Sequence, residues 1–210
     1  MDIFEELLGK YPALAGCIEE IRAAGEAILA LYRRGGKLLV CGNGGSGADS
    51  EHIVGELMKE FYIRRPLKQE EQDRLKQIDP AGEKLAMHLQ GALPAITLTS
   101  NIALSTAYAN DAEPDLVFAQ QVWGYGRPGD VLLAISTSGS SKNVYYAIVA
   151  AKARGMEVIG LTGAGAGTMD KLCHICIKAP SAVTYEVQEY HLPIYHALCR
   201  NVEAEIFGSK

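Results

Sequence analysis

Residues 130–141 have the sequence DVLLAISTSGSS, in which an unbroken apolar run leads into a loop of serine, threonine and glycine. Residues 131–135 are long enough for a buried strand, and the residues over 143–154 predict a helix. A strand that is apolar on both faces must be covered on both faces, which is typical of a parallel sheet. This stretch therefore predicts one strand–loop–helix unit of an α/β protein.

The same alternation of strand and helix continues on either side of this unit. Further strands are predicted at residues 37–41, 94–98, 157–161 and 174–178, and further helices at 50–61, from about 102, and at 185–206. Pro193 lies inside the last of these helices and could kink it. Strands that alternate with helices favour a doubly wound α/β fold with helices on both faces of the sheet.

The N-terminal region carries apolar residues at helical spacing over residues 3–33. Pro12 and Gly16 are expected to divide it into two helices. We therefore expect a single domain over residues 1–210, in which 1–34 form an N-terminal helical extension.

Residues 64–91 interrupt this pattern with a long polar and highly charged insertion. We expect a short helix after Pro66 and another over residues 83–89. A connection of this length inside a compact domain is usually functional or mobile. The insertion could form a lid, bind a partner or reshape a pocket.

The composition excludes several classes of protein. A formal charge of −5 with mixed signs argues against a general nucleic-acid binder. The chain has no twenty-residue apolar span and begins with an acidic segment, so we expect a cytoplasmic protein that is not in the membrane.

The five cysteines are an odd number and lie mostly in apolar runs, which favours free, buried thiols. Cys173 and Cys176 have the C-x-x-C spacing of some zinc and redox sites. If residues 174–178 form a strand, these two side chains are expected to point to opposite faces. Because the chain has no second such pair, we expect structural thiols here rather than a zinc site.

Two loops follow predicted strands and have the composition of ligand-binding loops. Residues 136–141 are hydroxyl-rich and lead into a helix, whose N-terminal N–H groups attract an anion. A plain helix cap needs only one serine or threonine, so this density favours a phosphate site. Residues 41–47, CGNGGSG, match neither a P-loop nor a convincing dinucleotide motif, and indicate close approach of a ligand to the backbone.

Two predicted helices carry imidazole and carboxylate or amide groups at helical spacing. His52 and Glu56 are four residues apart, and Gln188 and His196 are eight apart, so each pair shares a helix face. His191 lies between the latter two and could also face inward. Such pairs suit metal ligation and proton transfer, although most such pairs are only solvated side chains on the surface of a helix.

Taken together, these motifs resemble the SIS (sugar isomerase) family, and within it the phosphoheptose isomerases. The matching segments are CGNGGS at 41–46, His52-x-x-x-Glu56-Leu57, Asn110-Asp111, STSGSS at 136–141 and Gln188-Glu189-x-His191. The resemblance covers almost the entire chain. It implies a three-layer αβα, flavodoxin-like SIS fold with a five-stranded parallel sheet, and a homotetramer.

The resemblance also implies roles for individual residues. Glu56 and His196 would be the proton-transfer pair in the isomerisation of sedoheptulose 7-phosphate. The implied substrate-binding residues are Asn43, Gly44, Gly45, Asn110, Asp111, Ser136, Thr137, Ser138, Ser141 and Gln188. The implied ligands of a zinc ion, found in some members, are His52, Glu56, Gln188 and His196.

Three alternatives stay open at this point. Glu56 could be a base or a zinc ligand, since a zinc-bound carboxylate is a poorer base. The chain could be a non-catalytic SIS protein that binds a phosphosugar as a regulator or contacts a protein partner, or an enzyme that acts on a six-carbon sugar. The length of 64–91 and the presence of Tyr185, where the family often has an acidic residue, bear on the choice of sugar.

Overall fold

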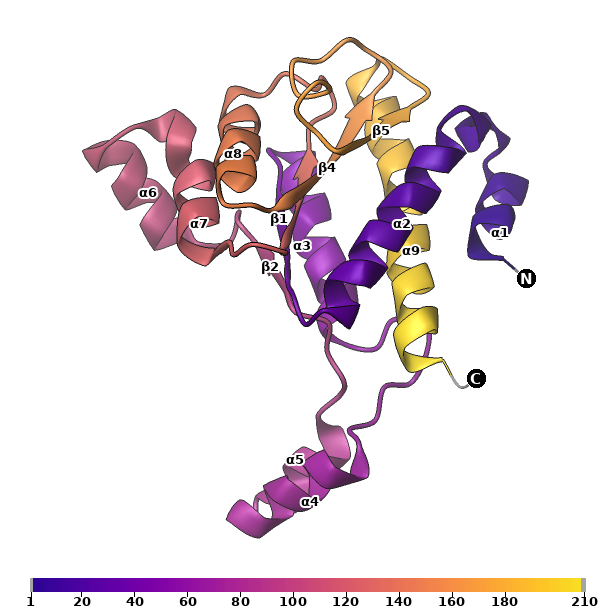
Figure 1. The fold of residues 1–210 in the computed structure, drawn as a ribbon, viewed down its shortest axis with the longest axis vertical. Helices are drawn as coiled ribbons and strands as arrows, with labels where there is room; N and C mark the ends of the chain where they lie inside the picture. Colours follow the sequence, from indigo (N-terminus) through magenta and orange to yellow (C-terminus); the bar gives the residue numbers. More distant parts are fainter. Residues whose placement is uncertain (1, 209–210) are drawn as a thin grey trace.

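The computed structural model describes residues 2–208, which contain a five-stranded, wholly parallel sheet in the order β2-β1-β3-β4-β5 (Figure 1). The strands are β1 (Leu38–Cys41), β2 (Ala95–Thr97), β3 (Val131–Ile135), β4 (Glu157–Gly163) and β5 (Ile175–Ala179). This is the flavodoxin-like order, in which the direction of winding reverses between β1 and β3. The predicted parallel α/β fold is confirmed.

Helices cover both faces of the sheet, because the side chains of each strand alternate between two apolar clusters. Val131, Leu133 and Ile135 of β3 pack on the side of α2 (Ile18–Arg33), α3 (Gly45–Met58) and α9 (Thr184–Phe207). Leu132 and Ala134 pack on the other side, with α7 (Val117–Tyr125) and α8 (Lys142–Ala153). All five residues of β3 are buried, as the apolar run predicts.

The helix predictions hold with one clear shift. The N-terminal region divides at a 3₁₀ turn, Pro12–Cys17, between α1 (Ile3–Lys10) and α2. Helix α3 begins at Gly45 and ends at Met58, whereas the sequence predicted 50–61. The predicted start was too late because residues 44, 45 and 47 are glycines, and glycine has a low helix propensity. Helix α9 continues through Pro193.

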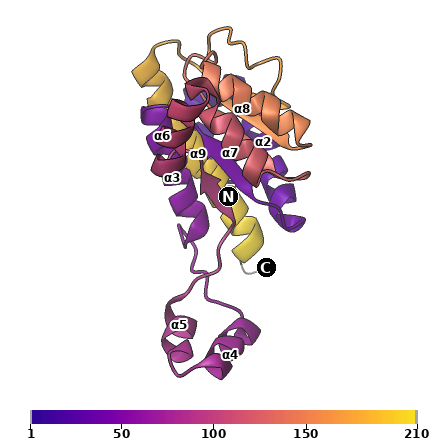
Figure 2. The same ribbon diagram turned by 90° about the vertical axis from the view of Figure 1, so that its left-hand side faces the viewer.

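The insertion forms a helical hairpin of α4 (Gln69–Ile78) and α5 (Gly82–His88), as predicted. Figures 1 and 2 show it standing away from the sheet and its covering helices. Its base is held by an antiparallel bridge between Pro66 and Gln90 and by the buried pair of Arg65 with Glu203. Helix α6 (Ile102–Asp111) and the 3₁₀ turn Pro114–Leu116 lie beside α7.

The expectation that Cys173 and Cys176 point to opposite faces is wrong. Strand β5 begins at Ile175, so Cys173 lies in the preceding turn, where strand alternation does not apply. Both sulfurs instead lie over Gly160 of β4. The two thiols are half-buried, whereas Cys17, Cys41 and Cys199 are buried; all five are free.

Candidate active site

A cavity of about 300 Å³ opens at the carboxyl ends of β1 and β3, at the switch point of the sheet. Ligands of open α/β sheets bind at this position. The side chains and backbone that line it come from both predicted loops and from the start of α9. The lining residues are Asn43, Gly44, Gly45, Ser46, Ile135, Ser136, Thr137, Ser141, Thr184 and Gln188.

The serine-rich loop presents hydroxyls to this cavity. Ser136 Oγ lies 2.9 Å from Ser141 Oγ and 3.5 Å from Ser138 Oγ. Ser141 is the N-cap residue of α8, yet its hydroxyl makes no capping hydrogen bond within the described residues. Helix capping by its side chain therefore does not explain why a serine stands at this position. The hydroxyl instead contacts Ser136 beside the cavity, where the N-terminus of α8 favours an anion.

The glycine-rich loop supplies a second helix N-terminus to the same cavity. Helix α3 begins at Gly45, after Gly44 with φ +56°, and it too lacks a side-chain cap among residues 2–208. A Cβ on Gly42 would lie 2.6 Å from the carbonyl oxygen of Ser46, so this turn requires glycine. Two helix N-termini that meet at one cavity give it a positive potential suited to phosphate.

Asn43 and Asn143 connect the two loops. Asn43 Nδ2 donates to Asn143 Oδ1 at 2.8 Å, and Asn143 Nδ2 donates back to Asn43 Oδ1 at 2.9 Å. The sequence analysis did not identify Asn143 or the cavity residue Thr184. Nothing local marks Asn143 as functional, because its partner is 100 residues away in the sequence.

His52, Glu56 and His196 form a cluster where α3 packs against α9. His52 Nε2 lies 3.3 Å from Glu56 Oε1, and the rings of His52 and His196 have centroids 5.0 Å apart. His52 Nδ1 lies 3.0 Å from the hydroxyl of Tyr195, which donates to Asp49 Oδ1 at 3.3 Å. This chain of contacts fixes the orientation of the His52 ring. Sequence reasoning did not identify Tyr195 or Asp49.

The environment of His196 favours its neutral form. Burial, and then the neighbouring His52, hold the pKa of His196 below its usual value. Its Nε2 is buried and has no hydrogen-bond partner among residues 2–208. A buried nitrogen without a partner is available to bind a substrate oxygen or a metal ion.

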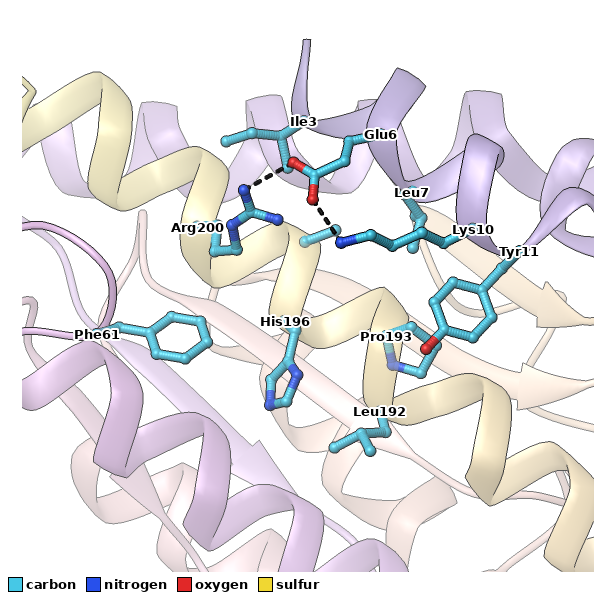
Figure 3. A pocket seen from close by; sticks show the side chains of 11 residues that line it. Ile3, Glu6, Leu7, Lys10, Tyr11, Phe61, Leu192, Pro193, His196 and Arg200 are labelled. Carbon is cyan, nitrogen blue, oxygen red and sulfur yellow. Dashed lines mark hydrogen bonds and ion pairs between the residues drawn. The ribbon is translucent and has the colours of Figure 1, made fainter. Parts of the chain in front are cut away.

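His196 also borders a second cavity, of about 190 Å³, between α1 and α9 (Figure 3). Arg200 and Lys10 both bind Glu6 here, at 2.9 and 2.7 Å. The two cations hold the pKa of Glu6 at about 2, Arg200 having the larger effect. The His196 cavity and the cavity at the switch point share no lining residue.

The remaining predicted residues have different positions. Gln188 lines the cavity at the switch point, and its amide lies against Gly45. His191 faces the core, where its Nε2 lies 3.2 Å from the carbonyl oxygen of Thr162. Asn110 and Asp111 end α6, bond to each other at 2.8 Å and are not among the residues that line either cavity.

Zinc fits the donor chemistry of part of this cluster. Two imidazoles and one carboxylate are donors that zinc prefers, and His196 Nε2 is unpartnered in the described chain. Gln188, the fourth predicted ligand, lies at the other cavity. As the side chains stand, no three His, Cys, Asp or Glu residues within 2–208 are arranged to hold a metal ion.

Comparison with known proteins agrees with this fold. The SIS domain family model matches residues 14–72 and 81–163, so the chain belongs to the SIS domain family. None of the helices over residues 2–208 is long and apolar enough to span a membrane.

The similar proteins define the group within this family. The phosphoheptose isomerase of Rhodospirillum rubrum is 42% identical over 190 residues, which are 90% of this chain and 88% of the relative. The solved phosphoheptose isomerase of Neisseria gonorrhoeae is 33% identical with a TM-score of 0.75, over 96% of this chain and 95% of that one. That of Francisella tularensis is 32% identical with a TM-score of 0.76, over 95% and 93%. The chain groups with the phosphoheptose isomerases, which are aldose–ketose isomerases.

Proposed function

We propose that this chain converts sedoheptulose 7-phosphate into D-glycero-D-manno-heptose 7-phosphate through an enediol. The observation that carries this proposal is the position of the His52–Glu56–His196 cluster relative to the cavity at the switch point. Gln188 at the cavity and His196 in the cluster are two turns apart on α9, about 12 Å along its axis. In this proposal, the sugar chain of a heptose held by its phosphate in this cavity reaches toward the cluster.

The reaction moves one proton between neighbouring carbons and one between their oxygens. In this proposal Glu56 removes the proton from C1 of the ketose and returns it to C2. His196 transfers the hydroxyl proton from O1 to O2. Its depressed pKa keeps the imidazole neutral near pH 7, so it can accept and donate in one cycle. Ser136, Thr137, Ser138 and Ser141 hold the phosphate, while Asn43 and Gln188, which line the cavity, contact the sugar.

Glu56→Gln tests this assignment. We expect kcat with sedoheptulose 7-phosphate to fall about 10²–10⁴-fold, because the amide cannot accept the carbon-bound proton. Binding of the phosphosugar, measured by calorimetry, should change little. Glu60→Gln, four residues away, is the matched control and should behave like the wild type. A Glu56→Gln variant with near-normal kcat would remove Glu56 from the reaction.

The same assay separates the alternatives. Turnover of fructose 6-phosphate in preference to the heptulose would indicate a six-carbon substrate. Tight binding of the phosphosugars without turnover of any, in the presence and absence of zinc, would indicate a regulator.

Zinc is part of the proposal as a bound ion. His52 and His196 would hold it, with Glu56 as a further ligand only in a form in which Glu56 is not the base, and Gln188 would complete the set if its amide turned from Gly45. Zinc supplies Lewis-acid polarisation of a carbonyl when bound. Calorimetric titration of the metal-free protein with zinc should show one site per chain. The Glu56→Gln substitution should lower the zinc affinity of this site.

We also propose a cytoplasmic homotetramer. The hairpin supports assembly, because Ile78 and Met87 are 81% and 77% exposed and no residue of α4 is buried. So short a pair of helices gains little stability without a further apolar contact. Light scattering after size exclusion measures the mass, and an Ile78→Asp variant should dissociate if the hairpin lies in an interface.

A further inference from the structure

Cys173 and Cys176 form a thiol pair that the proposed isomerisation does not use. A Cβ placed on Gly160 would lie 2.8 Å from the sulfur of Cys173 and 3.3 Å from that of Cys176. Because Gly160 has no side chain, both sulfurs lie over the same backbone position of β4. Both thiols are partly open to solvent.

The pair differs from a metal site and from the other three cysteines. No third imidazole, thiol or carboxylate completes a metal-binding group there in the part of the chain described. Cys17, Cys41 and Cys199 are buried, and burial raises their thiol pKa to about 11, 12 and 12. The pKa of Cys176 is instead lowered, because the effect of the neighbouring Cys173 thiol exceeds the opposing effects of burial and of Asp170. A thiol of lowered pKa beside a second thiol suits disulfide exchange.

The thiol pair is connected to the phosphate loop through Asp170. The thiol of Cys176 lies 3.6 Å from Asp170 Oδ1, and Asp170 Oδ2 binds Lys178 and accepts from the Gly167 N–H at 3.4 Å. The neighbouring Met169 N–H donates to the carbonyl oxygen of Gly139 at 3.1 Å. A Cβ on Gly139 would lie 3.0 Å from Gly167 Cα, so the turn over residues 167–170 packs directly on the serine-rich loop.

We propose that Cys173 and Cys176 form a reversible disulfide by reaction with low-molecular-weight disulfides. This disulfide lowers the affinity of the serine-rich loop for the phosphate of the substrate. The thiolate of Cys176 attacks one sulfur of the small disulfide and expels one small thiolate. The thiolate of Cys173 then attacks the Cys176 sulfur and expels the second. The two cysteines lose two electrons and two protons, and the small disulfide becomes two thiols.

The contacts of Asp170 explain how the disulfide would change phosphate binding. Bond formation draws the two sulfurs to covalent distance and removes the Cys176 S–H that donates to Asp170. Asp170 loses one of its partners, and the turn that supports Gly139 is displaced. The consequence for phosphosugar affinity rests on the proposed function, whereas the chemistry of the thiols does not.

The first test counts thiols in the wild-type protein after incubation with excess glutathione disulfide. The denatured protein should show three free thiols instead of five, and peptide mapping should link Cys173 to Cys176. Dithiothreitol should restore all five. Cys173→Ser should keep glutathione bound at Cys176, because no second thiol resolves it. Cys17→Ser is the matched control and should still close the disulfide. Five remaining thiols, or a link to a buried cysteine, would overturn the site.

The second test compares KM for sedoheptulose 7-phosphate before and after oxidation. We expect at least a threefold rise in the wild type that dithiothreitol reverses, and no such reversible rise in a Cys173→Ser/Cys176→Ser variant. An unchanged KM in a protein shown to be oxidised would refute the link to the phosphate loop. If the protein turns over no phosphosugar, the thiol count still decides whether the disulfide site exists.

Discussion

The buried pair of Arg65 and Glu203 gives the sharpest stability prediction. Both side chains are fully buried, and Arg65 Nε donates to Glu203 Oε1 at 2.7 Å. The same carboxylate accepts the backbone N–H groups of Phe61, Tyr62 and Ile63 at 2.8–3.1 Å. The pair thereby fixes the base of the hairpin to α9.

Glu203→Ala should destabilise the fold strongly. It leaves a buried guanidinium without its counter-ion, which typically costs about 3–5 kcal/mol, and three N–H groups without their acceptor. For a chain of this size, that corresponds to a fall in Tm of about 6–20 °C. Urea unfolding, followed by circular dichroism at one fixed protein concentration, measures the change in free energy.

Two further variants make the test specific. Glu205→Ala, on the same helix, removes an exposed pair with Arg33 and should cost at most about 1 kcal/mol. Arg65→Met/Glu203→Leu removes both charges and should be more stable than Glu203→Ala, because no orphaned charge remains. A loss below about 1 kcal/mol for Glu203→Ala, or a double variant that is no better, would refute the reasoning.

Three other predictions concern the site and the core. Tyr195→Phe removes the hydroxyl that orients His52 and should lower kcat about 10–100-fold, with KM nearly unchanged in steady-state kinetics; an unaltered kcat would exclude this role. Burial lowers the pKa of His191 to about 4, so only the unfolded chain gains a proton as the pH falls from 6.5 toward 4. Stability should therefore decrease over this range, and His191→Gln should flatten the decrease when urea unfolding is compared at pH 7 and pH 5; equal slopes for both proteins would contradict this. Gly45→Ala places a Cβ 2.3 Å from Gln188 Nε2 and should raise KM for the phosphosugar about three- to tenfold, whereas normal KM would show that Gln188 is not needed there.

Local patterns in the sequence predicted most of the architecture. The apolar run at 131–135 predicted a buried strand, and hydrophobic burial on both faces made that strand part of a parallel sheet. The loop that follows it was predicted to bind an anion, and it lines the cavity at the switch point. These features depend on neighbours in the chain, so a single sequence can reveal them.

Contacts between distant residues were decided only by the tertiary structure. Asn43 meets Asn143 and Arg65 meets Glu203 because packing of helices on the sheet brings them together. The strand boundary at Ile175 and the absence of a side chain at Gly160 bring the two sulfurs to one face, where strand alternation predicted the opposite. The sequence by itself determined the periodicity, the ligand-binding loops and the residue types available for chemistry. Only the tertiary structure determined which of those residues meet, because hydrogen bonds and ion pairs depend on distances that hydrophobic periodicity does not specify.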